Sequence, residues 1–226
     1  FLGNQVKDEH FDYAQFEELG SSPPTMEAAM AIDALSLLPG WELTQSDAVS
    51  AYTQQFLGGG RDKGTPTYVG LPKHRWPKEW HGKYKNPVVP LILNLYGHVD
   101  AGGWWESYSE EQILKCDWEK ILGWRSCYYH PATGATLVVY VDDLKLACHS
   151  SYTMQLWRGL DSVLKLDPPS YPDRFLGCHQ QEFEATAKDV ASLLQFHPDL
   201  FPREQTEPTP LKLADPDKKI RGYIYD

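Results

Sequence analysis

A run of mostly apolar, β-branched residues extends from Thr136 to Cys148 and carries two adjacent acids, Asp142 and Asp143, at its centre. Such a run predicts two buried strands, Leu137 to Val141 and Leu144 to Cys148, joined by a tight turn. We therefore expect both carboxylates at the tip of a hairpin that is surrounded by the protein core.

The patterns on either side of this hairpin predict helices and further strands. Ser22 and Pro23 are typical of a helix start, and that helix is expected to run to about Leu38. Alternation of apolar and polar residues then predicts a short strand from Trp41 to Asp47. Further predicted elements, in chain order, are an apolar run over residues 87–95, a helix that opens at Asp100, a strand over residues 124–129, a helix capped by Ser151 with an apolar stripe of Met154, Trp157, Leu160 and Leu164, and an extended piece over residues 175–177.

Asp47, at the end of its predicted strand, is a third acid that the fold could bring to the hairpin tip. Two like charges about 4 Å apart repel by roughly 4 kcal/mol at an effective dielectric constant near 20. A divalent cation would relieve this repulsion, and carboxylate ligands favour Mg²⁺ or Mn²⁺. Three carboxylates that converge from neighbouring strands can hold two such ions roughly 3.5 to 4 Å apart. The alternative for Asp142 and Asp143 is a turn that faces water.

The overall composition narrows the class of protein. The 226 residues suffice for one domain with a sizeable core, with or without an attached subdomain. The sequence has no stretch of about 18 apolar residues and no charged-then-apolar leader, which predicts an intracellular protein without a membrane span. The cysteines lack C-x-x-C spacing, so we expect reduced thiols rather than a zinc site at Cys116, Cys127, Cys148 and Cys178.

A net charge of −10 disfavours nucleic-acid binding by the surface as a whole, because phosphate contacts come mainly from Lys and Arg. One segment departs from this balance. Residues 73–85 contain three aromatic residues, one Glu and five formal positive charges, on Lys73, Arg75, Lys78, Lys83 and Lys85. Basic residues interleaved with aromatic ones favour contacts with phosphates and bases, so this segment is a candidate nucleic-acid-binding surface. The alternative is a solvated loop anchored by its tryptophans.

Four short blocks occur in an order that a known family shares. Gln45-Ser46-Asp47-Ala48-Val49-Ser50-Ala51-Tyr52 is followed by Leu95-Tyr96-Gly97, then by Tyr140-Val141-Asp142-Asp143, and finally by Phe175-Leu176-Gly177. These blocks resemble the first palm motif, the Y-G-L-K-Q segment, the Y-V-D-D box and the F-L-G block of the reverse transcriptases of copia-type retrotransposons. The resemblance spans about residues 25–182.

The resemblance implies an α+β fold in which helices pack on a palm-like antiparallel sheet, with partial fingers. It implies a fingers remnant over residues 1–24, a palm and fingers domain over residues 25–195, and a linker or truncated appendage over residues 196–226. The implied reaction is RNA-directed DNA synthesis from deoxynucleoside triphosphates on an RNA template and a DNA primer, with two Mg²⁺ or Mn²⁺ ions. Other polyprotein segments, such as RNase H and integrase, are implied partners, and a cytoplasmic virus-like particle or the nucleus is the implied location.

The family's metal site carries over to four residues of this sequence. The resemblance implies that Asp47, Asp142 and Asp143 bind the metal ions together with the backbone carbonyl of Ala48. Tyr52 would be the steric gate that rejects a ribose 2′-hydroxyl and so selects deoxynucleotides. The alternative for Tyr52 is an ordinary core aromatic.

Three further residues are expected near the incoming nucleotide. Gly102, in the first turn of its predicted helix, allows close approach of the backbone by a ligand. Lys165 would help to neutralise the leaving phosphate, unless it is simply a solvated lysine. Asp100 stands where the family has glutamine after Y-G-L-K, and its negative charge would weaken triphosphate binding.

Other departures from the family keep a second hypothesis open. The basic finger strands that normally precede the first palm motif are largely absent, and no thumb of normal size is evident after Glu182. The second hypothesis is a catalytically inactive or repurposed retrotransposon-derived domain that binds nucleic acid or protein. A third, a metal-binding domain unrelated to polymerases, would require all four blocks to be coincidence.

Overall fold

The structure is a computed structural model, which describes residues 7, 23–60, 63, 66–98, 100–186 and 219–225. Within these residues it has an α+β fold, with three α-helices and antiparallel sheets. Most of the predicted fingers remnant over residues 1–24, and residues 187–218, lie outside the described residues. None of the described helices has the length and apolar character needed to cross a membrane.

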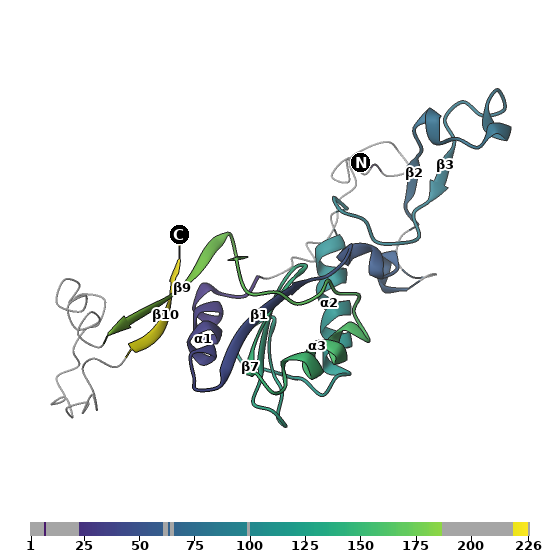
Figure 1. Cartoon of the computed structure of the whole chain (residues 1–226). Helices are drawn as coiled ribbons and strands as arrows, with labels where there is room; N and C mark the ends of the chain where they lie inside the picture. The colour runs from purple at the N-terminus through teal and green to yellow at the C-terminus, as the bar shows by residue number, and fades with distance from the viewer. Residues whose placement is uncertain are drawn as a thin grey trace.

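The central element is a five-stranded antiparallel sheet (Figure 1). Its strands follow one another in space in the order β1 (Trp41–Asp47), β7 (Asp143–His149), β6 (Thr136–Tyr140), β5 (Cys127–Tyr129) and β4 (Glu119–Lys120). The apolar run predicted as a hairpin forms β6 and β7, which are buried along almost their whole length. These two strands lie in the interior of the sheet because most of their side chains on both faces are apolar, so neither face is suited to contact with water.

Helices cover both faces of this sheet. α2 (Ala101–Leu114) and α3 (Thr153–Asp161) lie on one face, and α1 (Met26–Ser36) lies on the other (Figure 1). The core on the α2 and α3 side includes Trp105, Leu144, Leu146, Trp157 and Leu160. The core on the α1 side includes Ala29, Ile32, Leu43, Val138, Ala147 and Phe175. Alternate residues of β7 therefore enter different cores, as a strand with two buried faces requires.

A buried ion pair joins α1 to the central sheet. The side chains of Lys145, on β7, and Asp33, on α1, are both wholly buried and form a salt bridge. The second carboxylate oxygen of Asp33 accepts a 2.6 Å hydrogen bond from Gln180 Nε2. The Lys145 ammonium also lies 4.8 Å from the centre of the Phe175 ring. Burial lowers the pKa of Lys145, and the Asp33 carboxylate opposes that shift.

A second sheet packs beside α1. It consists of β8 (Arg174–Phe175), β9 (Cys178–Thr186) and β10 (Lys219–Tyr225), with β9 in the centre. The Arg221 side chain donates hydrogen bonds to the carbonyl oxygens of Ser36 and Trp41. Within the segment predicted as a linker or appendage, residues 219–225 therefore form a strand that contacts the end of α1.

The segment between residues 51 and 98 leaves the sheet and returns to it. It begins with two short 3-10 helices, η1 (Ala51–Gln54) and η2 (Leu57–Gly59), and then forms the two-stranded ribbon of β2 (Tyr68–Gly70) and β3 (Val88–Pro90). Two more 3-10 turns, η3 (Lys73–Arg75) and η4 (Lys78–Trp80), lie between these strands. We call residues 66–91 the basic arm, which projects away from the rest of the molecule (Figure 1).

Several predicted boundaries were wrong. α1 is capped by Thr25, whose Oγ1 accepts a hydrogen bond from the Ala28 amide, so the helix begins after both prolines rather than at Ser22 and Pro23. The strand predicted over residues 124–129 is confined to β5, and Tyr152 rather than Ser151 occupies the cap position of α3. Met154 is 54% exposed, because Leu156 and Thr153 take the buried positions of α3.

Candidate active site

The register of the central sheet brings Asp47 and Asp143 together, with Asp142 at the same turn. Asp47 on β1 is the direct antiparallel partner of Asp143 on β7, so their side chains leave the sheet on the same face. The amide of Ala48 donates a 2.7 Å hydrogen bond to the carbonyl oxygen of Asp142. Residues that are far apart in the sequence thus meet at one end of the sheet.

The hairpin turn differs by one residue from the predicted turn. Val141 and Asp142 form it, and Asp143 is already the first residue of β7. Val141 has a φ of 56°, in the left-handed region that a β-branched residue rarely adopts. Its carbonyl oxygen accepts a 2.5 Å hydrogen bond from the Trp105 indole of α2. The turn is therefore held in a strained conformation by a buried side chain beneath it.

The acids at this turn repel one another. The pKa of the half-buried Asp143 carboxyl is raised to about 6 by burial, by the negative charges of Asp47 and Asp142, and by a hydrogen bond with Asp47. Only a protonated carboxyl can donate to a neighbouring carboxylate, so this hydrogen bond favours the neutral form. A cation at this position would reverse the balance, because it would favour all three charged forms.

Two tyrosines flank the carboxylates. The rings of Tyr52, on η1, and Tyr96 lie 4.2 Å apart between their centres. The Tyr96 hydroxyl donates a 3.2 Å hydrogen bond to Asp142 Oδ2. Partial burial and the Asp142 carboxylate raise the pKa of Tyr96 to about 12, and burial also raises that of Tyr52. Tyr96 was missed as a site residue in the sequence, although it stands in the Leu95-Tyr96-Gly97 block.

The chemical type of the donors at the turn suits a hard divalent cation. Asp47, Asp142 and Asp143 offer carboxylate oxygens alone, which are the ligands of Mg²⁺ and Mn²⁺. Burial and the neighbouring negative charges both raise the pKa of Asp143, and a cation at the turn would oppose both effects. In the described part of the chain, no three or more His, Cys, Asp and Glu side chains are close enough to form a metal site. The Asp142 carboxylate is engaged by Tyr96 instead.

Of the other predicted nucleotide-site residues, Lys165 lies beside the end of β1. The Lys165 carbonyl accepts a 2.9 Å hydrogen bond from the Val49 amide, and the Asp167 amide donates to the Asp47 carbonyl. This backbone pairing holds Lys165 beside the end of β1, with its side chain exposed. Asp100 occupies the cap position of α2, but its side chain makes no capping hydrogen bond.

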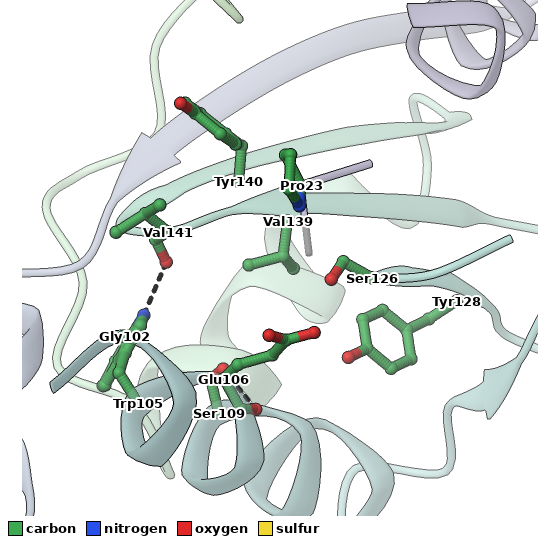
Figure 2. A pocket seen from close by; sticks show the side chains of 10 residues that line it. All are labelled: Pro23, Gly102, Trp105, Glu106, Ser109, Ser126, Tyr128, Val139, Tyr140 and Val141. Carbon is green, nitrogen blue, oxygen red and sulfur yellow. Dashed lines mark hydrogen bonds between the residues drawn. The ribbon is translucent and has the colours of Figure 1, made fainter. Parts of the chain in front are cut away.

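Gly102 lines a small cavity behind the turn. The cavity has a volume of about 130 Å³ and lies between the first turns of α2 and strands β5 and β6. Figure 2 shows the Glu106 carboxylate directed into this space, between Val139 and Tyr128. Val141 and Trp105, which are joined by a hydrogen bond, both line this cavity, whereas Asp47, Asp142 and Asp143 do not.

The predicted nucleic-acid contacts lie on the basic arm. The side chains of Lys73, Arg75, Lys78, Lys83 and Lys85 are all exposed. The arm returns to the sheet through hydrogen bonds that join Leu57 to Ile92 and Asn94 to Gln55. The chain then reaches Tyr96, so the arm emerges from the end of the sheet that carries the acids.

No protein-family model matches this chain, and a search of curated proteins finds no significant match.

Proposed function

We propose that this chain is an RNA-directed DNA polymerase of the copia retrotransposon type. The observation that carries the proposal is the pairing of Asp47 with Asp143, next to the hydrogen bond between Ala48 and Asp142. A chain whose acids resembled the polymerase motifs by chance would have no reason to bring them to one turn. The α+β arrangement, with helices on both faces of an antiparallel sheet, is compatible with a polymerase palm.

Each residue at the turn has a task in the proposed reaction. Asp47, Asp142 and Asp143, with the carbonyl of Ala48, would hold two Mg²⁺ or Mn²⁺ ions. Such ions activate the primer 3′-hydroxyl and stabilise the pyrophosphate leaving group. Tyr52, held against Tyr96, would exclude a ribose 2′-hydroxyl from the nucleotide site. The template and primer would approach from the side of the basic arm.

Primer extension on a poly(rA)/oligo(dT) duplex with Mg²⁺ or Mn²⁺ tests the proposal. We expect extension by the wild-type chain and its loss in the Asp142→Asn, Asp143→Asn double variant, because the amides cannot replace charged ligands. A Lys115→Gln variant, at the exposed C-terminal cap of α2, is the control and should extend the primer normally. Absence of extension by folded wild-type protein under both metals would contradict the proposal.

One contact favours a second candidate function, a repurposed domain that binds nucleic acid without catalysis. The Tyr96 hydroxyl occupies an oxygen of Asp142 that a metal ion would need. Primer extension by the wild type and by Tyr96→Phe, which frees that oxygen and keeps the ring, separates the two functions. If the domain is repurposed, neither protein extends the primer, and if the site is functional, both proteins do.

A further inference from the structure

We propose that the tip of the basic arm, residues 73–85, is a binding surface for unpaired nucleic acid, on which cations contact the phosphates and aromatic rings stack on the bases. The inference goes beyond the proposed polymerase, because it requires neither the acids at the turn nor a metal ion. It assigns a class of ligand, unpaired nucleic acid, to a surface that lies away from the candidate active site.

The first argument is electrostatic. The chain as a whole has 31 acidic and 21 basic residues, yet the tip has five formal positive charges and one negative charge. Within the described ranges, none of the five cationic side chains forms an ion pair, whereas Lys115, Lys120 and Lys219 are each paired with a Glu. An unneutralised cluster on an acidic protein attracts polyanions locally while the rest of the surface repels them.

The second argument concerns the aromatic side chains of the tip. Trp76, Trp80 and Tyr84 belong to neither hydrophobic core, and Tyr84 is 46% exposed. The rings of Trp80 and Tyr84 meet edge to face, with an angle of 83° and 6.1 Å between their centres. In an edge-to-face pair only one ring lends a face to the contact, and the Lys83 ammonium lies 5.2 Å from the centre of the Tyr84 ring. A base that stacks on these aromatics would therefore meet a cation at the same place.

The third argument is that the tip is organised before any ligand binds. The Trp76 indole donates a 2.7 Å hydrogen bond to the carbonyl oxygen of Leu71, which fixes the orientation of the ring. Pro72 and Pro77 each precede a single 3-10 turn closed by backbone hydrogen bonds. Proline and closed turns reduce the conformational entropy that is lost when a ligand orders a loop.

The combination distinguishes unpaired strands from the other polyanions. A duplex offers its phosphates to the cations but keeps its bases stacked on one another, so the rings of the tip gain nothing. An acidic protein offers carboxylates but no row of planar bases. Single-stranded DNA and RNA offer both groups at a regular spacing, and the tip has both kinds of partner side by side.

The test measures binding of labelled oligothymidylate and oligouridylate of about 12 nucleotides by fluorescence anisotropy at low salt. It is done in EDTA on the full chain with the Asp142→Asn, Asp143→Asn substitutions. Polymerase activity is then absent from every sample and cannot affect the binding that is measured. We expect both oligonucleotides to bind, and a duplex of the same length to bind at least about tenfold more weakly.

Two sets of variants separate the charges from the rings. Lys78→Gln, Lys83→Gln and Lys85→Gln together should weaken binding at least about tenfold and reduce its salt dependence. The matched control, Lys115→Gln, Lys120→Gln and Lys219→Gln, removes the same charge elsewhere and should change binding by less than about twofold. Trp80→Ala should weaken single-strand binding at least about fivefold without changing the weaker duplex binding.

Three outcomes would overturn the proposal. Equal binding of duplex and single strand, unaffected by Trp80→Ala, would reduce the tip to a phosphate-binding patch. Displacement of the oligonucleotide by polyglutamate at the same charge concentration would indicate a docking surface for acidic proteins. Unchanged binding in the arm variants, with melting temperatures equal to wild type, would locate the binding elsewhere on the chain.

Discussion

Asp143 shows how a single residue links stability to function at this site. Its pKa is about 6 in the folded protein, above the usual value of 3.8, so the folded form binds a proton more readily than the unfolded form. This carboxyl therefore adds stability as the pH falls from about 6 to about 4, and costs stability above that window. The residue that the proposed chemistry needs charged is thus unfavourable to the fold when it is charged.

The first prediction follows from that sign. In EDTA at pH 7, Asp143→Asn should be more stable than wild type, because a neutral amide replaces a repelled carboxylate. With allowance for solvent screening at a half-buried site, we expect about 1 kcal/mol, or roughly 2 to 4 °C in melting temperature. The difference should disappear near pH 4. Thermal unfolding followed by circular dichroism at both pH values measures it, and equal melting temperatures at pH 7 would contradict it.

The second prediction concerns the cation itself. Because a ligand that binds only the folded state stabilises it, Mg²⁺ or Mn²⁺ should raise the melting temperature of the wild-type chain. The Asp142→Asn, Asp143→Asn variant should show no such increase. A buffer without divalent cations, brought to the same ionic strength with NaCl, is the control for general salt effects. An equal response in both proteins would exclude specific binding at the turn.

The third prediction concerns the buried pair of Lys145 and Asp33. Lys145→Met should destabilise the fold by about 3 to 5 kcal/mol, because it leaves a wholly buried carboxylate without its cation. Adding Asp33→Leu should recover a large part of that loss, since two apolar side chains replace the pair. Urea unfolding of the two variants provides the measurement. A double variant less stable than Lys145→Met would show that the pair stabilises the fold in itself.

At the scale of elements, α2 has a role that its helical pattern does not reveal. Its Trp105 indole holds the carbonyl oxygen of Val141 in the strained turn. We predict that Trp105→Phe costs about 1 kcal/mol of stability but reduces primer extension at least about tenfold, because the carboxylates lose their fixed position. Melting curves and extension rates, measured on the same preparations, separate the two effects.

Another buried tryptophan provides the matched control for that variant. The Trp157 indole of α3 donates a 2.9 Å hydrogen bond to Thr44 Oγ1, within β1 rather than at the turn. Trp157→Phe should therefore destabilise the protein by a similar amount and leave the extension rate per folded molecule unchanged. Similar losses of extension in both variants would show that Trp105 acts only through overall stability.

The elements that could be predicted from the sequence are those with a local signal. The hairpin of β6 and β7, the strand that ends at Asp47, and α2 all follow from periodicity and turn residues. The contact of Tyr96 with Asp142 and the pairing of Lys145 with Asp33 join segments 46 and 112 residues apart, and nothing local indicates them. The pairing of β10 with β9 also joins segments that are distant in the sequence, so no local pattern indicates it. The strand ends allowed the convergence of the acids, and the resemblance implied it.

At the scale of the whole molecule, acidic and basic side chains gather at different places. The central sheet brings three acids to one end, and the arm that emerges from that end presents five cations about its tip. Fields of opposite sign at the two places would draw a polyanionic strand toward the arm and keep it from the bare carboxylates until a cation neutralises them. Raising the salt concentration should weaken both effects together.

The contact between Tyr52 and Tyr96 has a consequence for how this chain can be rebuilt. The two rings meet on either side of the segment that contains the arm, so this segment is a loop closed at its neck by the two tyrosines. Halving such a loop changes the closure free energy by only about 0.6 kcal/mol. The arm can therefore be replaced without loss of the fold. A short glycine-serine turn in place of residues 66–91 should leave the hairpin site folded, and other tips could be grafted onto the same neck.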